Sequence, residues 1–230
     1  MSAAAGTYYH LSFQPAVRRS LRPLQIMRVT EDTEAPLRAV RVLREGGLVA
    51  YPTDTVYGIG CSAFNDAAVL RVYEVKRRPR SEPLPVLIAD AADLNERLVA
   101  AVPETARRLM LRFWPGALTL IFRKALWVPA ILTAGEERIA VRLPDHSIPR
   151  SLVRAAGAPL VGTSANVHGS AEPVTAQHVA FELGDRVDMI LDGGRTRRGL
   201  PSTVVDVTVD PPRVVRAGAL PRERIEEALR

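Results

Sequence analysis

Hydroxyl and carboxylate side chains alternate along the first of several polar, glycine-containing stretches of this sequence. It runs from Tyr51 to Gly60, and if it is extended, the side chains of Thr53, Thr55 and Tyr57 face one side. Its glycines would let a ligand approach the backbone closely. A threonine-rich strand end followed by a turn explains the same residues equally well, so this stretch alone leaves both interpretations open.

Positive charge is concentrated in the stretch 76–84, which begins Lys-Arg-Arg-Pro-Arg. Pro79 and Pro83 stiffen it, and fixed cations suit a multiply charged phosphate chain. Cations also stabilise the C-terminal end of a helix through its dipole. A phosphate site and a solvated basic helix end therefore both remain open for Lys76 and Arg78.

Two later stretches offer hydrogen-bond donors and further arginines. Residues 161–166 lead from an apolar segment into Thr163, Ser164 and Asn166, which suits a phosphate or ribose but is also typical of a capping turn. Residues 192–203 carry three arginines between glycines. That pattern fits a mobile flap or a plain surface hairpin.

Several common catalytic classes are excluded by missing motifs. The sequence has no G-x-x-x-x-G-K-[ST] phosphate loop, no G-x-G-x-x-G fingerprint, no H-E-x-x-H and no G-x-S-x-G elbow. The four histidines show no ligand spacing, and no nucleophile–base pair can be assigned. These absences favour a site that holds anions over one that forms a covalent enzyme intermediate.

Composition sets the broad class. The 230 residues carry a net charge of +6, which suits an anionic partner without choosing among nucleotide, nucleic acid or membrane surface. The lone Cys61 excludes an internal disulfide and a cysteine zinc cluster, so we expect a reducing, cytoplasmic location. No run of about eighteen apolar residues is present, so we expect no membrane span.

Apolar periodicity from residue 34 onward predicts alternating helices and strands in one domain. We expect strands near 48–51, 84–89, 118–122, 138–142, 159–162, 189–191, 203–207 and 214–215. Between them we expect helices, including one from about Asp93 and one from about Pro103. Residues 1–33 show no such pattern and are interpreted as an N-terminal arm, disordered or a non-native leader, before a domain at 34–230. The fold class is α/β, with a twisted open mixed sheet flanked by helices.

The polar stretches together resemble a known family, the YrdC-type proteins, which are L-threonylcarbamoyladenylate synthases. The resemblance covers about residues 34 to 218 and is closest to the short, single-domain form. Its ordered motifs are Y-P-T-D-T-V-Y-G-I-G at 51–60, K-R-R-P at 76–79, F-W-P-G-A-L-T at 113–119, V-R-L-P at 141–144, T-S-A-N at 163–166 and P-S-T-V-V-D at 201–206. Three positions depart from the usual pattern: Ala117, His168 and Leu87.

The resemblance implies a sheet around a large basic cavity and an ATP-dependent reaction. L-Threonine and bicarbonate or CO2 would give threonylcarbamoyl-AMP and pyrophosphate, with Mg²⁺ entering on ATP. A separate threonylcarbamoyl-transferase would then modify tRNA, and a direct tRNA contact is conceivable for this fold. Positioning and electrostatics would suffice for such chemistry, so no catalytic residue is assigned.

The same resemblance implies roles for eleven residues. The expected ATP-binding residues are Lys76, Arg78, Arg142, Ser164, Asn166 and Arg216. The expected threonine-binding residues are Thr53, Thr55, Tyr57, Thr119 and Ser202.

Two other functions compete with the synthase. A non-catalytic RNA- or nucleotide-binding module of the same fold would use Arg195, Arg197 and Arg198, but that stretch lacks aromatic residues for base stacking. A carbamoyl-transfer enzyme of the hydrogenase-maturation type would need acylphosphatase and zinc-finger segments that this sequence lacks. The sequence therefore favours the synthase.

Overall fold

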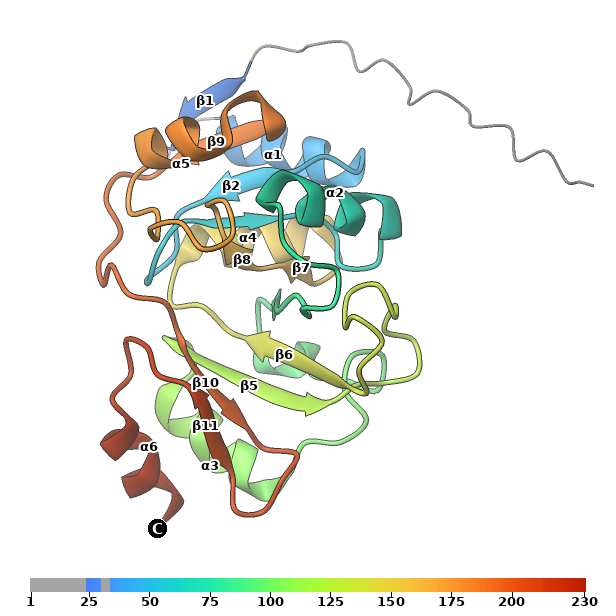
Figure 1. The fold of residues 1–230 in the computed structure, drawn as a ribbon, viewed down its shortest axis with the longest axis vertical. Coiled ribbons are helices and arrows are strands. Elements are labelled where there is room, and N and C mark those ends of the chain that lie inside the picture. Colours follow the sequence, from blue (N-terminus) through green and yellow to red (C-terminus); the bar gives the residue numbers. More distant parts are fainter. Residues whose placement is uncertain (1–23, 30–33) are drawn as a thin grey trace, which may run out of the picture.

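The computed structural model describes residues 24–29 and 34–230, and its strands form two sheets (Figure 1). The five-stranded sheet has the order β1-β9-β2-β3-β8, and the six-stranded sheet has the order β11-β10-β5-β6-β4-β7. The predicted α/β class is confirmed, but the strands expected in one sheet are divided between two.

The five-stranded sheet mixes parallel and antiparallel pairs. β1 and β2 run parallel to β9, whereas β3 is antiparallel to both β2 and β8. The strands are β1 (Gln25–Arg28), β2 (Val49–Tyr51), β3 (Gly58–Gly60), β8 (Thr163–Ser164) and β9 (Met189–Asp192). Because β1 pairs with β9 from Gln25 to Arg28, the sheet includes residues N-terminal to the expected boundary at 34. The remainder of the predicted arm, 1–23 and 30–33, lies outside the described residues.

The six-stranded sheet supplies the opposite side of the molecule. Its centre is an antiparallel β5–β6 pair, and β10 joins β5 in parallel. The strands are β4 (Val86–Leu87), β5 (Leu118–Arg123), β6 (Arg138–Arg142), β7 (Leu160–Val161), β10 (Thr203–Asp206) and β11 (Arg213–Arg216).

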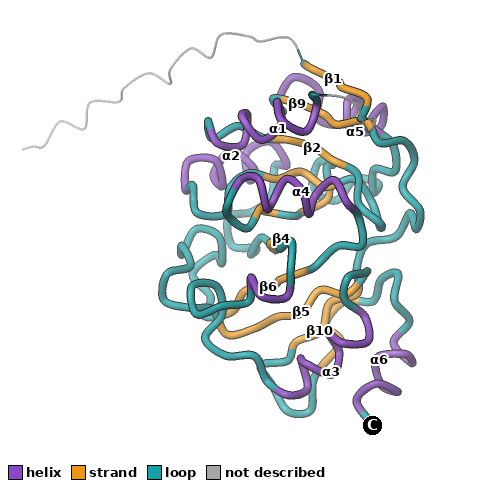
Figure 2. The backbone as a smooth tube through the Cα atoms, turned by 180° about the vertical axis from the view of Figure 1, so that it is seen from behind, coloured by secondary structure: helices purple, strands orange, loops and turns teal. Residues whose placement is uncertain are grey.

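Helices cover both faces of the five-stranded sheet and one face of the six-stranded sheet, as the front and back views show (Figures 1 and 2). Helices α1 (Ala35–Arg44), α2 (Asp66–Lys76), α4 (Ser147–Ala156) and α5 (Ala176–Leu183) accompany the five-stranded sheet, while α3 (Glu104–Phe113) and α6 (Arg222–Leu229) accompany the other. Short 3₁₀ turns occupy Ala91–Asp93 and Gly184–Arg186. Among the described residues, no helix is long and apolar enough to cross a membrane.

Local capping chemistry explains where the helices begin and end. The Asn65 side chain accepts a hydrogen bond from Ala68 N and so caps the start of α2, a role for which asparagine is well suited. Arg77 ends α2 in the left-handed region at φ 51°. The helix expected from about Asp93 is absent, so that prediction was wrong: Asp93 Oδ2 instead accepts the backbone N–H groups of Ala89 and Asp90, which closes a short turn.

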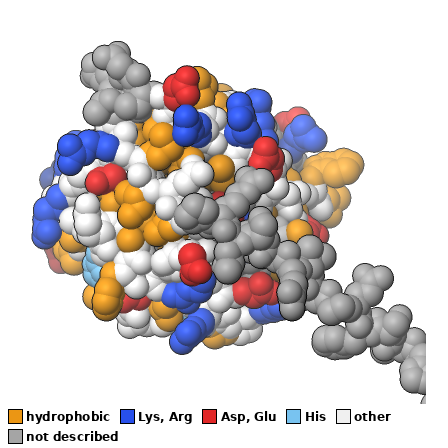
Figure 3. Space-filling model, turned by 90° about the horizontal axis from the view of Figure 1, so that it is seen from above, with side chains coloured by type: hydrophobic (Ala, Val, Ile, Leu, Met, Phe, Trp, Pro, Cys, Tyr) orange, Lys and Arg blue, Asp and Glu red, His pale blue; other side chains and the backbone are white. Residues whose placement is uncertain are grey.

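Charged side chains of both signs are interspersed with apolar ones on the face seen in Figure 3. No extended single-sign field covers the described part of that face.

Candidate active site

A cavity of about 450 Å³ lies where the two sheets face each other, and nine of the eleven predicted site residues line it. The six-stranded sheet contributes strands β5, β6, β10 and β11, whereas β8, the 53–56 turn and the end of α2 form the other wall. The nine are Thr55, Lys76, Arg78, Thr119, Arg142, Ser164, Asn166, Ser202 and Arg216.

The other two, Thr53 and Tyr57, do not line this cavity. Thr53 Oγ1 donates to the carbonyl of Val56 over 2.7 Å, and Tyr57 Oη donates to the carbonyl of Gly194 over 2.7 Å. Residues 54–56 bend, so the expected one-sided display of 53, 55 and 57 on an extended segment was wrong. Both residues line a small adjoining hollow of about 30 Å³, where they support the wall.

Arg142 is the buried centre of one wall. The residue is 7% exposed, and its guanidinium donates to Asp54 Oδ1 (2.5 Å), Thr55 Oγ1 (2.8 Å) and the carbonyl of Gly116 (2.9 Å). Burial lowers the pKa of Arg142, and the nearby Asp54 carboxylate opposes that shift. The arginine thus joins β6 of one sheet to the 53–56 turn of the other, and its hydrogen bond orients the Thr55 hydroxyl at the cavity.

Lys76 anchors the 164–166 stretch. Its ammonium group donates to the carbonyls of Ser164 (2.5 Å) and Asn166 (2.8 Å) and to Asn166 Oδ1 (3.3 Å). The residue is only 1% exposed. Besides the charge that the sequence predicted, Lys76 therefore fixes the two neighbouring site residues in place, a role the sequence did not indicate.

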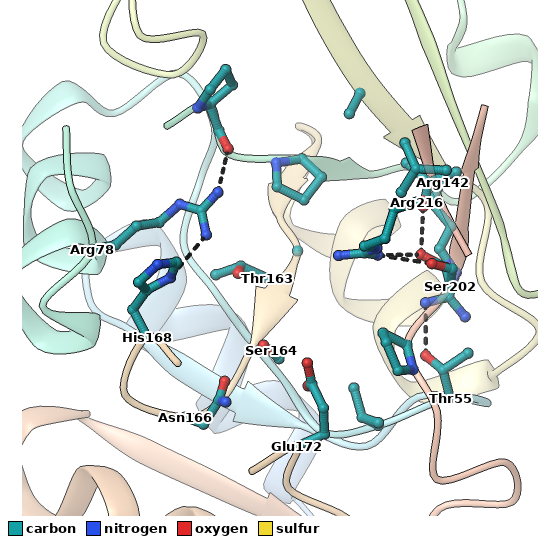
Figure 4. Close-up of a pocket in the computed structure, with 18 of the residues that line it drawn as sticks. Thr55, Arg78, Arg142, Thr163, Ser164, Asn166, His168, Glu172, Ser202 and Arg216 are labelled. Carbon is teal, nitrogen blue, oxygen red and sulfur yellow. Dashed lines mark hydrogen bonds between the residues drawn. The ribbon is translucent and has the colours of Figure 1, made fainter. Parts of the chain in front are cut away.

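Arg78 lies on the opposite side of the cavity from Arg142 and Arg216 (Figure 4). Its Nη2 donates to the carbonyl of Pro83 over 3.1 Å and lies 3.1 Å from Glu82 Oε2, while Nη1 is 3.5 Å from His168 Nδ1. The stiff proline-flanked loop thus holds the guanidinium, so it is more than a freely solvated helix end. His168 is exposed and also lines the cavity.

Hydroxyls meet a further arginine on the β5–β10–β11 side. Thr119 and Ser202 are joined by a 2.7 Å hydrogen bond between their hydroxyls. Arg216 Nη2 donates to the carbonyl (2.8 Å) and the hydroxyl (3.2 Å) of Ser202. Burial lowers the pKa of Arg216. Strand pairing therefore places a cation beside two hydroxyls at the cavity edge.

The arginine-rich stretch after β9 is fastened to the site. Gly199 N donates to the carbonyl of Thr55 over 3.0 Å, and Arg197 Nη2 donates to Asp145 at the carbonyl (2.6 Å) and Oδ2 (3.0 Å). Arg198 Nε lies 3.8 Å from Asp54 Oδ2. These contacts place the stretch against the 53–56 turn and Asp145.

Glu172 is a lining residue that the sequence did not single out. It lies on the loop between β8 and α5, and a single acid among small polar residues gives no periodic or motif signal. Its position depends on the packing of that loop against the cavity, which only the structure shows.

Gly218 is required for the Arg216 turn. A Cβ at this position would lie 2.4 Å from the carbonyl oxygen of Pro201 and 2.5 Å from the carbonyl carbon of Ser202. Since backbone must then move, we expect Gly218→Ala to lower the free energy of unfolding by about 1–3 kcal/mol, measured by urea denaturation, and to weaken nucleotide binding. The neighbouring exposed Ala217→Ser should change neither; equal losses in both variants would contradict this steric explanation.

The titration of Lys76 should be visible in anion binding. Burial, followed by the positive charge of Arg78, lowers the pKa of Lys76 from 10.5 to about 8. As the pH rises through that value the cavity loses a cation, so we expect the affinity for pyrophosphate, measured by calorimetry, to fall between about pH 7 and 9.5. In the unfolded chain Lys76 has the ordinary lysine pKa of about 10.4. The cost of burying its charge therefore lowers the free energy of unfolding in full below about pH 8. That cost is progressively removed above about pH 8, as the folded protein releases the proton. Lys76→Met should bind more weakly with a flatter pH profile; an unchanged profile would contradict the assignment.

Comparison with known proteins identifies the family. The Sua5/YciO/YrdC family, described as "Telomere recombination", matches residues 41–218. The chain belongs to this family. The threonylcarbamoyl-AMP synthase of Pyrococcus abyssi is 44% identical over 191 residues, which are 83% of this chain and 56% of that relative. The synthase of Bacillus subtilis is 45% identical over 193 residues, 84% of this chain and 56% of that relative.

A solved structure shows the same fold. The structure of P. abyssi Sua5 complexed with L-threonine has a TM-score of 0.85 and 41% identity, and the match covers 90% of this chain and 61% of that one. This chain thus spans little more than half the length of the Pyrococcus and Bacillus relatives. It spans 87% of a Mycobacterium tuberculosis relative, a putative threonylcarbamoyl-AMP synthase that is 40% identical over 83% of this chain.

Proposed function

We propose that this chain catalyses the ATP-dependent condensation of L-threonine with bicarbonate or CO2 to threonylcarbamoyl-AMP and pyrophosphate. The observation that carries the proposal is the cavity itself, in which four cations face a group of hydroxyls and an amide. The cations suit the phosphates of ATP, and the hydroxyl and amide groups suit the polar atoms of an amino acid. The names of the related synthases, and the threonine in the P. abyssi Sua5 structure, support this choice of substrates.

The proposed reaction depends more on the positioning of its substrates than on a side chain that forms a covalent intermediate. The neutral amine of threonine captures CO2, and a carbamate oxygen then attacks the α-phosphorus of ATP as the bond to pyrophosphate breaks. Negative charge develops on the leaving phosphates, where Arg78, Arg216 and the charge of Lys76 stabilise it. Thr55, Thr119 and Ser202 supply hydroxyls for the amino acid. Each proposed role thus draws on residues from both walls of the cavity.

Mg²⁺ would accompany ATP. The described residues contain no group of three or more acidic, histidine or cysteine side chains that could hold a metal ion. An ion bound chiefly by phosphates and water needs no such cage. We place the reaction in the cytoplasm, where a separate transferase would pass the threonylcarbamoyl group to tRNA.

Mass spectrometry tests the proposal directly. Purified protein is mixed with ATP, Mg²⁺, L-threonine and labelled bicarbonate, and we expect labelled threonylcarbamoyl-AMP together with threonine-dependent release of pyrophosphate. A reaction lacking threonine and one containing L-serine are the controls. Binding of ATP without any labelled product would overturn the proposal and favour a nucleotide- or RNA-binding module.

A further inference from the structure

Glu172 is the one carboxylate among the described residues that line the cavity. Its Oε2 is buried and has no hydrogen-bond partner in the described part of the chain. Figure 4 shows the side chain directed into the cavity, in the space between Asn166 and Thr55. A buried acceptor without a donor is unfavourable, so a ligand that brings a donor to this oxygen gains binding energy.

Nearby cations do not satisfy this carboxylate. Its charge raises the pKa of both Lys76 and Arg216, opposing the effect of burial on them. Yet Lys76 directs its hydrogen bonds to Ser164 and Asn166, and Arg216 directs its own to Ser202. The acid is thus close enough to influence two cations but retains an unused acceptor.

We propose that Glu172 binds the amino group of the amino-acid substrate; this inference rests on the proposed function. Phosphates and the amino-acid carboxylate are anions, which the four cations attract. The ammonium group is the only organic cation among the proposed substrates, and a carboxylate is its strongest hydrogen-bond partner. Figure 4 places Glu172 on the same side of the cavity as Thr55, whose expected role is also in amino-acid binding.

This arrangement is compatible with the nucleophilic step. The amine must be neutral when it attacks CO2, and a net positive cavity favours loss of its proton. A carboxylate accepts a hydrogen bond from the N–H of either the ammonium or the amine. Glu172 therefore orients the nitrogen throughout, while the cations keep the attacking form accessible.

Glu172→Gln tests the proposal because it preserves shape and removes the charge. We expect the dissociation constant for L-threonine, measured by calorimetry, to rise about tenfold to hundredfold, with ATP affinity retained or increased. Glu172→Asp should recover part of the loss. Retained ATP binding also shows that the variant is folded.

Two controls make the result specific. Glu182 also acts electrostatically on Lys76 but does not line the cavity, so Glu182→Gln should bind threonine normally. An analogue of threonine in which a hydroxyl replaces the amino group should bind wild type and Glu172→Gln equally. If Glu172→Gln weakens threonine and this analogue equally, or shifts only the Mg²⁺ dependence, the amino-group assignment is wrong. If wild type binds ATP but no threonine, the proposed function itself fails.

Discussion

Arg142→Met should lower the free energy of unfolding by about 3–5 kcal/mol, the range found when one partner of a buried ion pair is removed. Asp54 is fully buried, and Arg142 provides its closest ionic contact at 2.5 Å. Without the guanidinium, that carboxylate keeps only the backbone N–H of Asp145 at 3.2 Å and the more distant Arg198. Urea denaturation at neutral pH measures the loss.

A double-mutant cycle separates the charge from the packing. Asp54→Asn alone should also destabilise, because it leaves the Arg142 charge buried without its partner. The pair Asp54→Asn with Arg142→Met should lose less than the sum of the two single losses, since neither charge is then left uncompensated. Strictly additive losses would show that the two side chains contribute independently.

Lys76→Met should reduce kcat/KM for the proposed synthase reaction by about two to three orders of magnitude, comparable to removing one donor that stabilises developing charge. Two effects combine in this variant. The cavity loses the positive charge that we propose to stabilise the phosphates, and three acceptors on Ser164 and Asn166 lose their shared donor. Steady-state pyrophosphate release measures the change.

A matched lysine away from the site provides the control. Lys124 is largely buried and lies 3.6 Å from Glu137, but it does not line the cavity, so Lys124→Met should retain its turnover. Arg78→Gln should weaken ATP use with little effect on the 164–166 stretch, because Arg78 makes no hydrogen bond to it. A normal rate for Lys76→Met would contradict both roles of the lysine.

The sequence predicted which residues meet at one cavity better than it predicted the arrangement of the sheets. Its polar stretches follow strands or end helices, and local signals such as the Asn65 cap locate those elements well. The division into two sheets depends on long-range pairing, for example of β1 with β9, which local patterns do not encode. Strands of two residues, such as β8, are too short to show periodicity.

Individual side-chain directions were the least predictable part. Thr53 and Tyr57 occupy the expected motif but turn to the carbonyls of Val56 and Gly194. Lys76 was expected at the phosphates and proved also to anchor a neighbouring loop. Each of these outcomes depends on which carbonyl the folded backbone brings within reach, and the position of Glu172 depends on how its loop packs against the cavity.

The hydrogen bonds of Arg142 from β6 to the turn after β2 have a consequence for folding. A chain with only one sheet formed has only one wall of the cavity and cannot hold the proposed nucleotide. A ligand of the cavity would therefore bind only the fully assembled domain. At a free ligand concentration 100 times the dissociation constant, binding would add about 2.7 kcal/mol to the free energy of unfolding. A molecule with ligand bound would therefore have both sheets formed. In a cell that contains saturating ligand, the correctly folded molecules would be the ones most resistant to unfolding.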